Sequence, residues 1–187
     1  MRADAARKRE QVVAAAVDEL ADLAKAARKG EPTRLSLDQV AARAGVGIAT
    51  LYRHFPTREA LLAAVYQQEL TRLCDAAPKL ATSGPADAAL LGWMTSYLDF
   101  IESKRAMGDS LRAMVASGAV TQAETRARVG TAMSHFLDAG AAAGIFRPDI
   151  PPDDVVAVMV GSAVAAQDHE QAQRLLVLLI HGLRQPI

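Results

Sequence analysis

The segment Ser36–Phe55 reads S-L-D-Q-V-A-A-R-A-G-V-G-I-A-T-L-Y-R-H-F and predicts two short helices joined by a tight turn. Ser36 is a candidate N-cap residue, and a glutamine follows at the spacing of a capping box. Gly45 is expected to end the first helix, because glycine readily takes the left-handed conformation of a helix C-cap. Leu51 and Phe55 are four residues apart and are expected to face inward. The segment therefore predicts a helix-turn-helix, in which the second helix can enter the major groove of DNA.

The outer face of the second helix carries side chains that suit contact with DNA. Hydroxyl and imidazole groups can hydrogen-bond to phosphate oxygens, and an arginine adds positive charge. Small residues also let the helix backbone approach the DNA closely. An ordinary helical hairpin with a polar outer face is the alternative that this pattern alone leaves open. The residues on this face are Gly47, Ile48, Ala49, Thr50, Tyr52, Arg53 and His54.

The motif A-x-x-A-G-V-x-x-x-T-L-Y-R-H-F, followed by P-T-R-E-A-L-L, resembles the DNA-binding segment of the TetR family of bacterial transcriptional regulators. Its residues are Ala41–Val46, Thr50–Phe55 and Pro56–Leu62. The resemblance covers residues 35–62. Outside that range the chain resembles the family only in its length and its all-helical character.

The resemblance implies roles for individual residues of the motif. It assigns phosphate contacts to Ser36, Thr50, Tyr52, His54, Thr57 and Arg58. It places Gly47, Ile48, Ala49 and Arg53 nearest the bases, with Arg43 at the edge of the groove. Many relatives have serine and a basic or polar residue where this chain has Gly47 and Ile48. We therefore expect apolar contacts there, for example with thymine methyl groups.

Charge is distributed unevenly along a chain of 187 residues whose formal net charge is zero. Residues 1–66 contain 11 Lys and Arg against 8 Asp and Glu, a net charge of +3, and residues 67–187 contain 10 against 13, a net charge of −3. This division suits a protein that binds DNA with one end. It also suggests two domains, a helix-turn-helix domain in residues 1–66 and a helical ligand-binding and dimerisation domain in residues 67–187.

Apolar residues recur at helical spacing along the chain, and no strand of any length is expected. The predicted fold is all-α, with a three-helix head, a connector helix that begins after Thr57 and ends before Pro78, and a C-terminal helical bundle. The basic residues near the N-terminus, from Arg2 to Arg9, fit either a solvated terminus or contact with DNA. The single cysteine, Cys74, excludes an internal disulfide. With no apparent signal peptide or membrane span, we expect a cytoplasmic protein.

The two helices predicted nearest the C-terminus suggest a homodimer. The first of them, in residues 154–167, is apolar nearly all round, and such a helix must be covered on every side. A central core helix of the monomer is the alternative. The resemblance favours a dimer, because the family commonly pairs through its last two helices, and two-fold symmetry then implies a palindromic operator. The candidate interface residues are Val158, Gly161, Ala165, Leu175, Leu176, Leu179 and Leu183.

The resemblance also implies an effector, since family members typically release DNA when a small molecule enters the helical bundle. Such pockets are mostly apolar with a few polar groups. Large apolar residues at helical spacing are also what an ordinary core requires, so that alternative remains open. The chemical identity of the effector is not predicted. The candidate pocket residues are Trp93, Met94, Tyr97, Met107, Leu111, Met114, Met133, His135 and Phe136.

No catalytic, metal-binding or cofactor-binding motif is found in the sequence. Asp168–Glu170, which reads D-H-E, is interpreted as a polar turn rather than a metal site. The expected function is a ligand-responsive repressor that binds operator DNA. An activator of the same family and a helical ligand-binding protein with a non-functional head are the alternatives.

Overall fold

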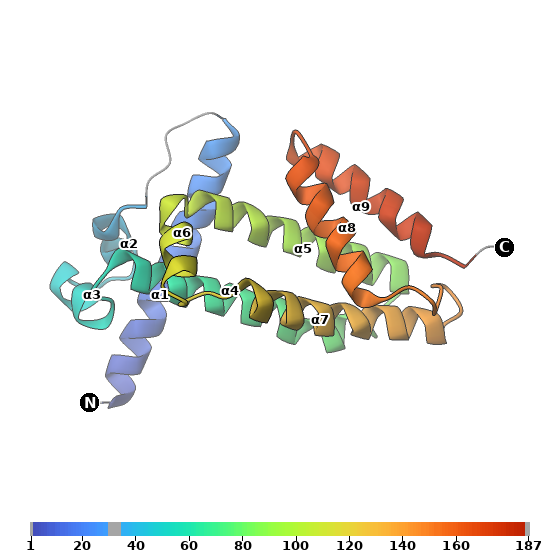
Figure 1. The fold of residues 1–187 in the computed structure, drawn as a ribbon. Helices are drawn as coiled ribbons and strands as arrows, with labels where there is room; N and C mark the ends of the chain where they lie inside the picture. Colours follow the sequence, from blue (N-terminus) through green and yellow to red (C-terminus); the bar gives the residue numbers. More distant parts are fainter. Residues whose placement is uncertain (1, 30–34, 186–187) are drawn as a thin grey trace. The chain divides into compact units, whose positions relative to one another are not determined.

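The structure, a computed structural model, describes residues 2–29 and 35–185 and is all-α, as predicted from the sequence (Figure 1). Within these two ranges the only strand-like pairing is an isolated antiparallel bridge between Phe146 and Arg184. None of the helices in these ranges is both long and apolar enough to cross a membrane. The helices are α1 (Arg2–Arg28), α2 (Leu37–Arg43), α3 (Ile48–His54), α4 (Arg58–Leu80), α5 (Ala86–Ala106), α6 (Asp109–Ala116), α7 (Gln122–Ala142), α8 (Pro152–Ala165) and α9 (His169–Leu183).

Contacts divide the chain into two compact units. The first unit consists of Met1–Glu69 and Glu102–Thr121, and the second consists of Leu70–Ile101 and Gln122–Ile187. Helices α4 and α5 each begin in one unit and end in the other. The first unit thus includes α6, which lies beyond the boundary at residue 66 that is expected from the sequence.

The first unit is built around the apolar face of α1. Val12, Ala16 and Leu20 recur at helical spacing on this face and are fully buried. Helices α2 and α3 both pack against α1. Leu51 of α3 and Phe55, the C-cap residue of that helix, are buried as the sequence predicts. Burial of these side chains fixes which face of α3 remains exposed.

The second unit has an aromatic core that joins α4, α5 and α7. The Trp93 ring lies 5.3 Å from the Phe136 ring and 6.3 Å from the Tyr97 ring, measured between centroids. The indole Nε1 of Trp93 donates a 2.9 Å hydrogen bond to the carbonyl of Leu73. The polar group of this large side chain is therefore satisfied inside the core.

Helices α8 and α9 form an antiparallel hairpin, and α8 packs on α7 (Figure 1). The chain after α9 pairs with the turn that follows α7. The Arg147 N–H donates to the Leu183 carbonyl at 2.8 Å, and the Gln185 N–H donates to the Ile145 carbonyl at 3.0 Å. These bonds join the end of α9 to the turn that follows α7.

Helix α4 extends further than the sequence predicts. It was expected to end before Pro78, but it contains this proline and continues to Leu80. Proline cannot donate to the carbonyl four residues earlier. Because Pro78 lies in the last turn, few helical hydrogen bonds follow it, and the Ala81 N–H still donates to the Ala77 carbonyl at 2.9 Å.

Gly140 allows α7 to approach Phe146 closely, since a Cβ atom added there would lie 2.0 Å from the Phe146 ring. We expect Gly140→Ala to lower the free energy of unfolding by about 1–3 kcal/mol, the usual cost of overpacking a core. Gly92→Ala is the matched control, because a Cβ atom at that exposed helical position meets nothing within 4 Å. It should stabilise α5 by about 0.5–1 kcal/mol. Urea denaturation of both variants measures the two effects, and equal stabilities would contradict the packing assigned to Gly140.

Candidate nucleic-acid interface

The turn between α2 and α3 has the local geometry that the sequence predicts. The Ser36 side chain caps α2 by accepting a 3.4 Å hydrogen bond from the Gln39 N–H. Gly45 has a φ of 66°, in the left-handed region that favours glycine. The Val46 N–H then donates to the Ala41 carbonyl at 3.0 Å and closes the turn.

Helix α3 begins with backbone contacts alone. Gly47 is its N-cap residue and has an ordinary φ of −70°. The Gly47 carbonyl accepts from the Thr50 N–H at 2.8 Å and from the Leu51 N–H at 3.1 Å. No side chain caps this end, and the residues on either side of Ile48, Gly47 and Ala49, are small.

The outer face of α3 carries two large exposed side chains, with Ile48 exposed to 37% and Tyr52 to 49%. Gly47, Ala49 and Arg53 are also exposed, while Thr50 and His54 are half-buried. Arg53 folds back along its own helix, where its Nε donates to the Ala49 carbonyl at 3.3 Å and its Nη2 donates to the Thr50 hydroxyl at 3.4 Å. Seven predicted DNA-contacting residues thus lie together on one short helix or at its N-cap.

The start of α4 places two more predicted contact residues close behind α3. The Thr57 hydroxyl caps α4 by accepting a 3.1 Å hydrogen bond from the Ala60 N–H. Arg58 follows as the first helical residue and is half-buried. The positive end of a helix dipole favours an anion at such a position. Ser36, the N-cap residue of α2, is also half-buried.

Arg43 is exposed, with 37% of its side chain accessible, and its guanidinium reaches back to α1. Its Nη2 lies 2.9 Å from Asp22 Oδ2 and 3.6 Å from Glu19 Oε2, and both carboxylates belong to α1. The hydrogen bond from Arg43 holds the pKa of Asp22 below its ordinary value, and the same bond raises the pKa of Arg43. Arg43 thus joins α2 to α1, and its expected place at the edge of the groove stays a prediction.

Arg9 has a structural contact that the sequence pattern did not reveal. Its guanidinium lies 4.9 Å from the centroid of the Phe55 ring, a cation–π distance. Arg9 belongs to the basic N-terminal run, for which a solvated terminus and DNA contact were both open. The side chain of Arg2, in the same run, lies outside the described residues. A contact between residues so far apart in the chain has no local sequence signal.

The predicted pocket residues are divided between the two units. Met107, Leu111 and Met114 belong to the first unit, and the remaining six belong to the second. Trp93, Met94, Tyr97, Met133 and Phe136 are buried there. His135 is exposed instead.

His135 lines a surface hollow of about 360 Å³ together with Cys74 and Arg128. Burial raises the pKa of the Cys74 thiol. Arg128 is engaged with the Thr71 hydroxyl, to which its Nη2 donates at 2.9 Å. His135 is therefore associated with this hollow rather than with the buried aromatic residues of the predicted pocket.

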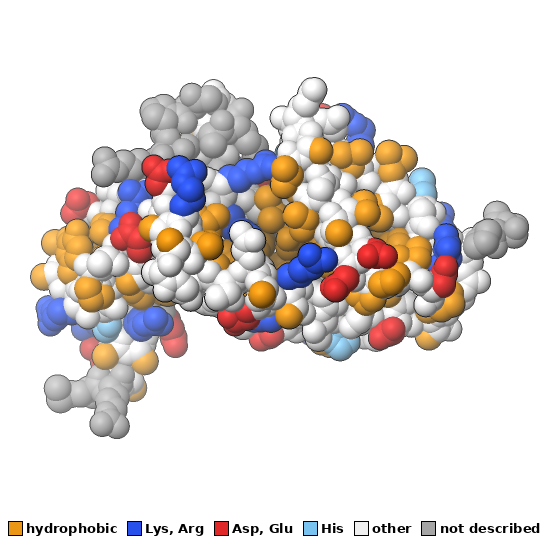
Figure 2. All heavy atoms as spheres, in the orientation of Figure 1, with side chains coloured by type: hydrophobic (Ala, Val, Ile, Leu, Met, Phe, Trp, Pro, Cys, Tyr) orange, Lys and Arg blue, Asp and Glu red, His pale blue; other side chains and the backbone are white. Residues whose placement is uncertain are grey.

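The predicted dimer residues differ in their exposure. Gly161 and Ala165 are exposed, as is Val158 at 51%, whereas Leu175 and Leu179 are half-buried. Leu176 and Leu183 are buried by their own chain. Two further large apolar side chains on α8 and α9 are more exposed than Val158, Val164 at 67% and Leu178 at 65%. Hydrophobic side chains gather over these two helices (Figure 2).

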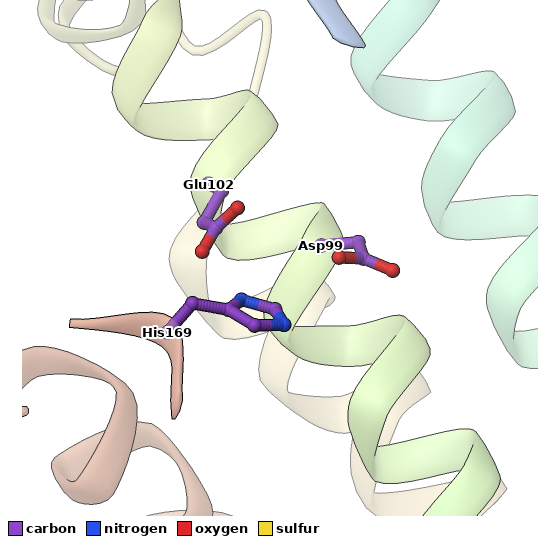
Figure 3. A group of neighbouring side chains, drawn as sticks. All are labelled: Asp99, Glu102 and His169. Carbon is purple, nitrogen blue, oxygen red and sulfur yellow. The ribbon is translucent and has the colours of Figure 1, made fainter. Parts of the chain in front are cut away.

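His169 begins α9, and its ring points toward Asp99 of α5 within the second unit (Figure 3). A ligand atom of each residue lies within 4.8 Å of the other. Glu102 follows one turn later on α5 and belongs by its contacts to the first unit. Structural zinc sites usually have four protein ligands and catalytic ones three. The pair within the second unit therefore does not define a metal site.

Two family models match the chain and together cover most of it. The model of the bacterial regulatory proteins of the tetR family matches residues 29–65, which contain α2 and α3. The model of the C-terminal domain of SbtR-like transcriptional regulators matches residues 85–185, more than half of the chain.

Similar proteins of known structure or function are also regulators. The crystal structure of a TetR transcriptional regulator from Streptomyces coelicolor is 39% identical in sequence, covers 96% of this chain and 99% of its own, and has a TM-score of 0.79. That of a TetR transcription regulatory protein from Mycobacterium vanbaalenii is 30% identical, covers 98% of this chain and 99% of its own, and has a TM-score of 0.72. The HTH-type transcriptional repressor KstR of Mycobacterium tuberculosis is 27% identical over 150 residues, which are 80% of this chain but 60% of KstR.

Gly45 and Gly47 differ in backbone conformation although they lie in the same turn, so they form a matched pair for mutation. We expect Gly45→Ala to lower the free energy of unfolding by about 1–2 kcal/mol, because its φ of 66° disfavours a side chain. Gly47→Ala should cost less, about 0.5 kcal/mol, because φ is ordinary and a Cβ atom meets nothing within 4 Å, so that only the poorer N-cap preference of alanine counts. Denaturant titration of both variants measures the difference. Similar losses at both positions would contradict the role of Gly45 in the turn.

Proposed function

The chain belongs to the TetR family of bacterial regulators, and we propose that it represses transcription by binding a palindromic operator as a homodimer. The observation that supports this most strongly is the exposed face of α3. Leu51 and Phe55 are buried on the inner side. The other seven residues of the range Gly47–His54 lie on the outer side or at its rim. Under this proposal α3 enters the major groove.

The polar residues around α3 are proposed to hold the DNA backbone. Contacts with phosphate groups fix the register of a protein on DNA without reading its sequence. The hydroxyl, imidazole and guanidinium groups proposed for these contacts belong to Ser36, Thr50, Tyr52, His54, Thr57 and Arg58. Tyr52 is the most exposed large side chain among them. The base-proximal set is Gly47, Ile48, Ala49 and Arg53. Because Ile48 is the large apolar member of that set, we assign it to thymine methyl groups in the operator.

The α8–α9 hairpin is proposed as the dimer interface. Val158 and Val164 on α8 and Leu178 on α9 expose half or more of their surface. Apolar side chains grouped in this way commonly belong to an interface between proteins. Gly161 and Ala165 would allow close approach of helices, and Leu175 and Leu179 would lie beside them. Leu176 and Leu183 already pack within their own chain, so Val164 and Leu178 replace them in the proposed interface.

A small-molecule effector is proposed to release the protein from DNA by binding in the second unit. The aromatic residues Trp93, Tyr97 and Phe136, with Met94 and Met133, supply the apolar walls that such a site needs. An effector acts only if it binds the DNA-free state more tightly than the DNA-bound state. Similarity to KstR, a transcriptional repressor, supports repression over activation. The protein would act in the cytoplasm, where the bacterial chromosome lies.

Fluorescence anisotropy with DNA from beside the gene of this protein, compared with scrambled DNA over a series of salt concentrations, tests the proposal. We expect selective binding, a steep decrease of affinity with salt, and saturation at two or four chains per duplex. Equal weak binding to both DNAs would oppose operator recognition at that site. Selection of bound fragments from genomic DNA would then find an operator elsewhere or contradict DNA binding.

Uracil substitution tests the role of Ile48, because uracil lacks only the 5-methyl group of thymine. We expect replacement of the contacted thymine to weaken the wild-type protein about fourfold, the value of one buried methyl group. The Ile48→Ala variant should not distinguish thymine from uracil.

Tyr52→Phe is the comparison variant, and loss of its hydroxyl should weaken binding to all sequences alike, by about tenfold. If Ile48→Ala kept the preference for thymine, its proposed base contact would be wrong.

Charge at Leu178 tests the dimer interface. We expect Leu178→Glu to raise the dimer dissociation constant by about thirtyfold or more, because a buried apolar interface excludes charge. Leu80→Glu is the matched control, since Leu80 is another exposed leucine, at the end of α4. Sedimentation equilibrium of both variants measures the constant. A dimer that is equally stable in both would place the interface elsewhere.

A further inference from the structure

Arg43 joins α2 to α1 through two carboxylates. Its Nη2 lies 2.9 Å from Asp22 Oδ2 and 3.6 Å from Glu19 Oε2. Asp22 and Glu19 are three residues apart and therefore lie on the same face of α1. Arg43 is the last residue of α2, two residues before the left-handed turn at Gly45. The ion pair is thus formed at the end of α2, next to the turn that leads into α3.

Glu19, the second carboxylate that contacts Arg43, is buried. It is one of two polar residues in the described ranges that are as buried as the core, with 9% of its surface exposed. A buried carboxylate needs a positive or hydrogen-bonding partner, because removing it from water is costly. In the part of the chain that the structure describes, Arg43 is the cation within salt-bridge distance of Glu19. Replacing Arg43 would leave that carboxylate without its ion-pair partner.

The net charge of this group disfavours a role in holding phosphate. Arg43 Nη2 lies within 4.0 Å of Asp22 and Glu19, and Lys25 Nζ lies 3.5 Å from Asp22 Oδ1, so two positive and two negative charges meet here. A phosphate that approached Arg43 would meet a group whose total charge is zero rather than positive. The Thr50 and Thr57 hydroxyls instead accept from Arg53 Nη2 and from the Ala60 N–H.

We propose that Arg43 is a positioning residue, which fixes the α2–α3 pair on α1 through Asp22 and Glu19 and does not itself contact DNA. This inference rests on the proposed function, because the geometry it maintains is that of the DNA-binding face. Loss of Arg43 has two consequences, a less restrained α2 and a net negative charge on the group of Asp22, Glu19 and Lys25 that remains. Both weaken operator binding without removing a phosphate contact.

Variants of equal net charge separate the positioning role from a phosphate contact. The set is wild type, Arg43→Gln, Asp22→Asn, the double variant Arg43→Gln with Asp22→Asn, and the double variant Arg43→Gln with Glu10→Gln. The two double variants have the net charge of the wild type. They differ in whether the removed carboxylate is a partner of Arg43, because Glu10 is an exposed residue of α1 outside the group formed by Arg43, Asp22 and Glu19.

Two measurements are made on each protein, operator affinity over a salt series and the melting temperature without DNA. We expect Arg43→Gln to weaken operator binding by about tenfold, at the lower end of the loss from one mismatched base pair. Removal of Asp22 in the same chain should recover at least about threefold of this loss, whereas removal of Glu10 should recover less than about twofold. The slope of affinity against salt should be unchanged. The effects of Arg43→Gln and Asp22→Asn on the melting temperature should be non-additive.

A phosphate contact by Arg43 would give a different pattern and overturn the proposal. Both double variants would then bind equally weakly, and the magnitude of the salt slope would fall by about one in every variant that lacks Arg43. Additive effects on the melting temperature would also overturn it. If the wild-type protein bound no DNA selectively, the proposed function would fail. The melting temperatures, which need no DNA, would still show whether Arg43 and Asp22 are coupled.

Discussion

The relation between α2 and α3 depends on one backbone torsion angle, the φ of 66° at Gly45. It reverses the chain so that the Val46 N–H reaches the Ala41 carbonyl. The two helices can then both place apolar side chains, Val40 and Leu51, in the same buried layer over α1. Because Leu51 faces this layer, the opposite face of α3, which carries Ile48 and Tyr52, is exposed. A residue with no side chain thus determines which side chains the protein presents.

The sequence predicts this region well because its signals are local. A capping serine, a glycine at the end of the first helix and two apolar residues four positions apart each report on the few residues around them. Ser36, Gly45, Leu51 and Phe55 all behave as expected. The end of α4 was less predictable, because Pro78 disrupts little when it lies in a last turn.

Contacts between distant residues account for what the sequence did not predict. Arg43 and Asp22 are 21 positions apart, and Arg9 and Phe55 are 46 apart, so no periodic pattern relates them. An arginine beside a DNA-binding helix looks the same in the sequence whether it faces phosphate or a carboxylate. Similarly, the apolar run of α8 predicts that the helix is buried, but it does not show which of its residues pack within their own chain. In α8, Val156 is buried and Val158 is exposed, although both belong to the same apolar run.

The modest charge of the DNA-binding end makes its geometry more important. Residues 1–66 carry a net charge of only +3, so non-specific attraction to DNA contributes little compared with a strongly basic domain. Under the proposed function, affinity comes instead from two copies of α3 that fit successive major grooves together, with centres about 34–36 Å apart. Such bivalent binding is lost when the spacing does not allow both copies to engage. A small displacement in the second unit of a dimer then suffices for release, provided that contacts such as those of Arg43 keep each α2–α3 pair rigid on its own α1.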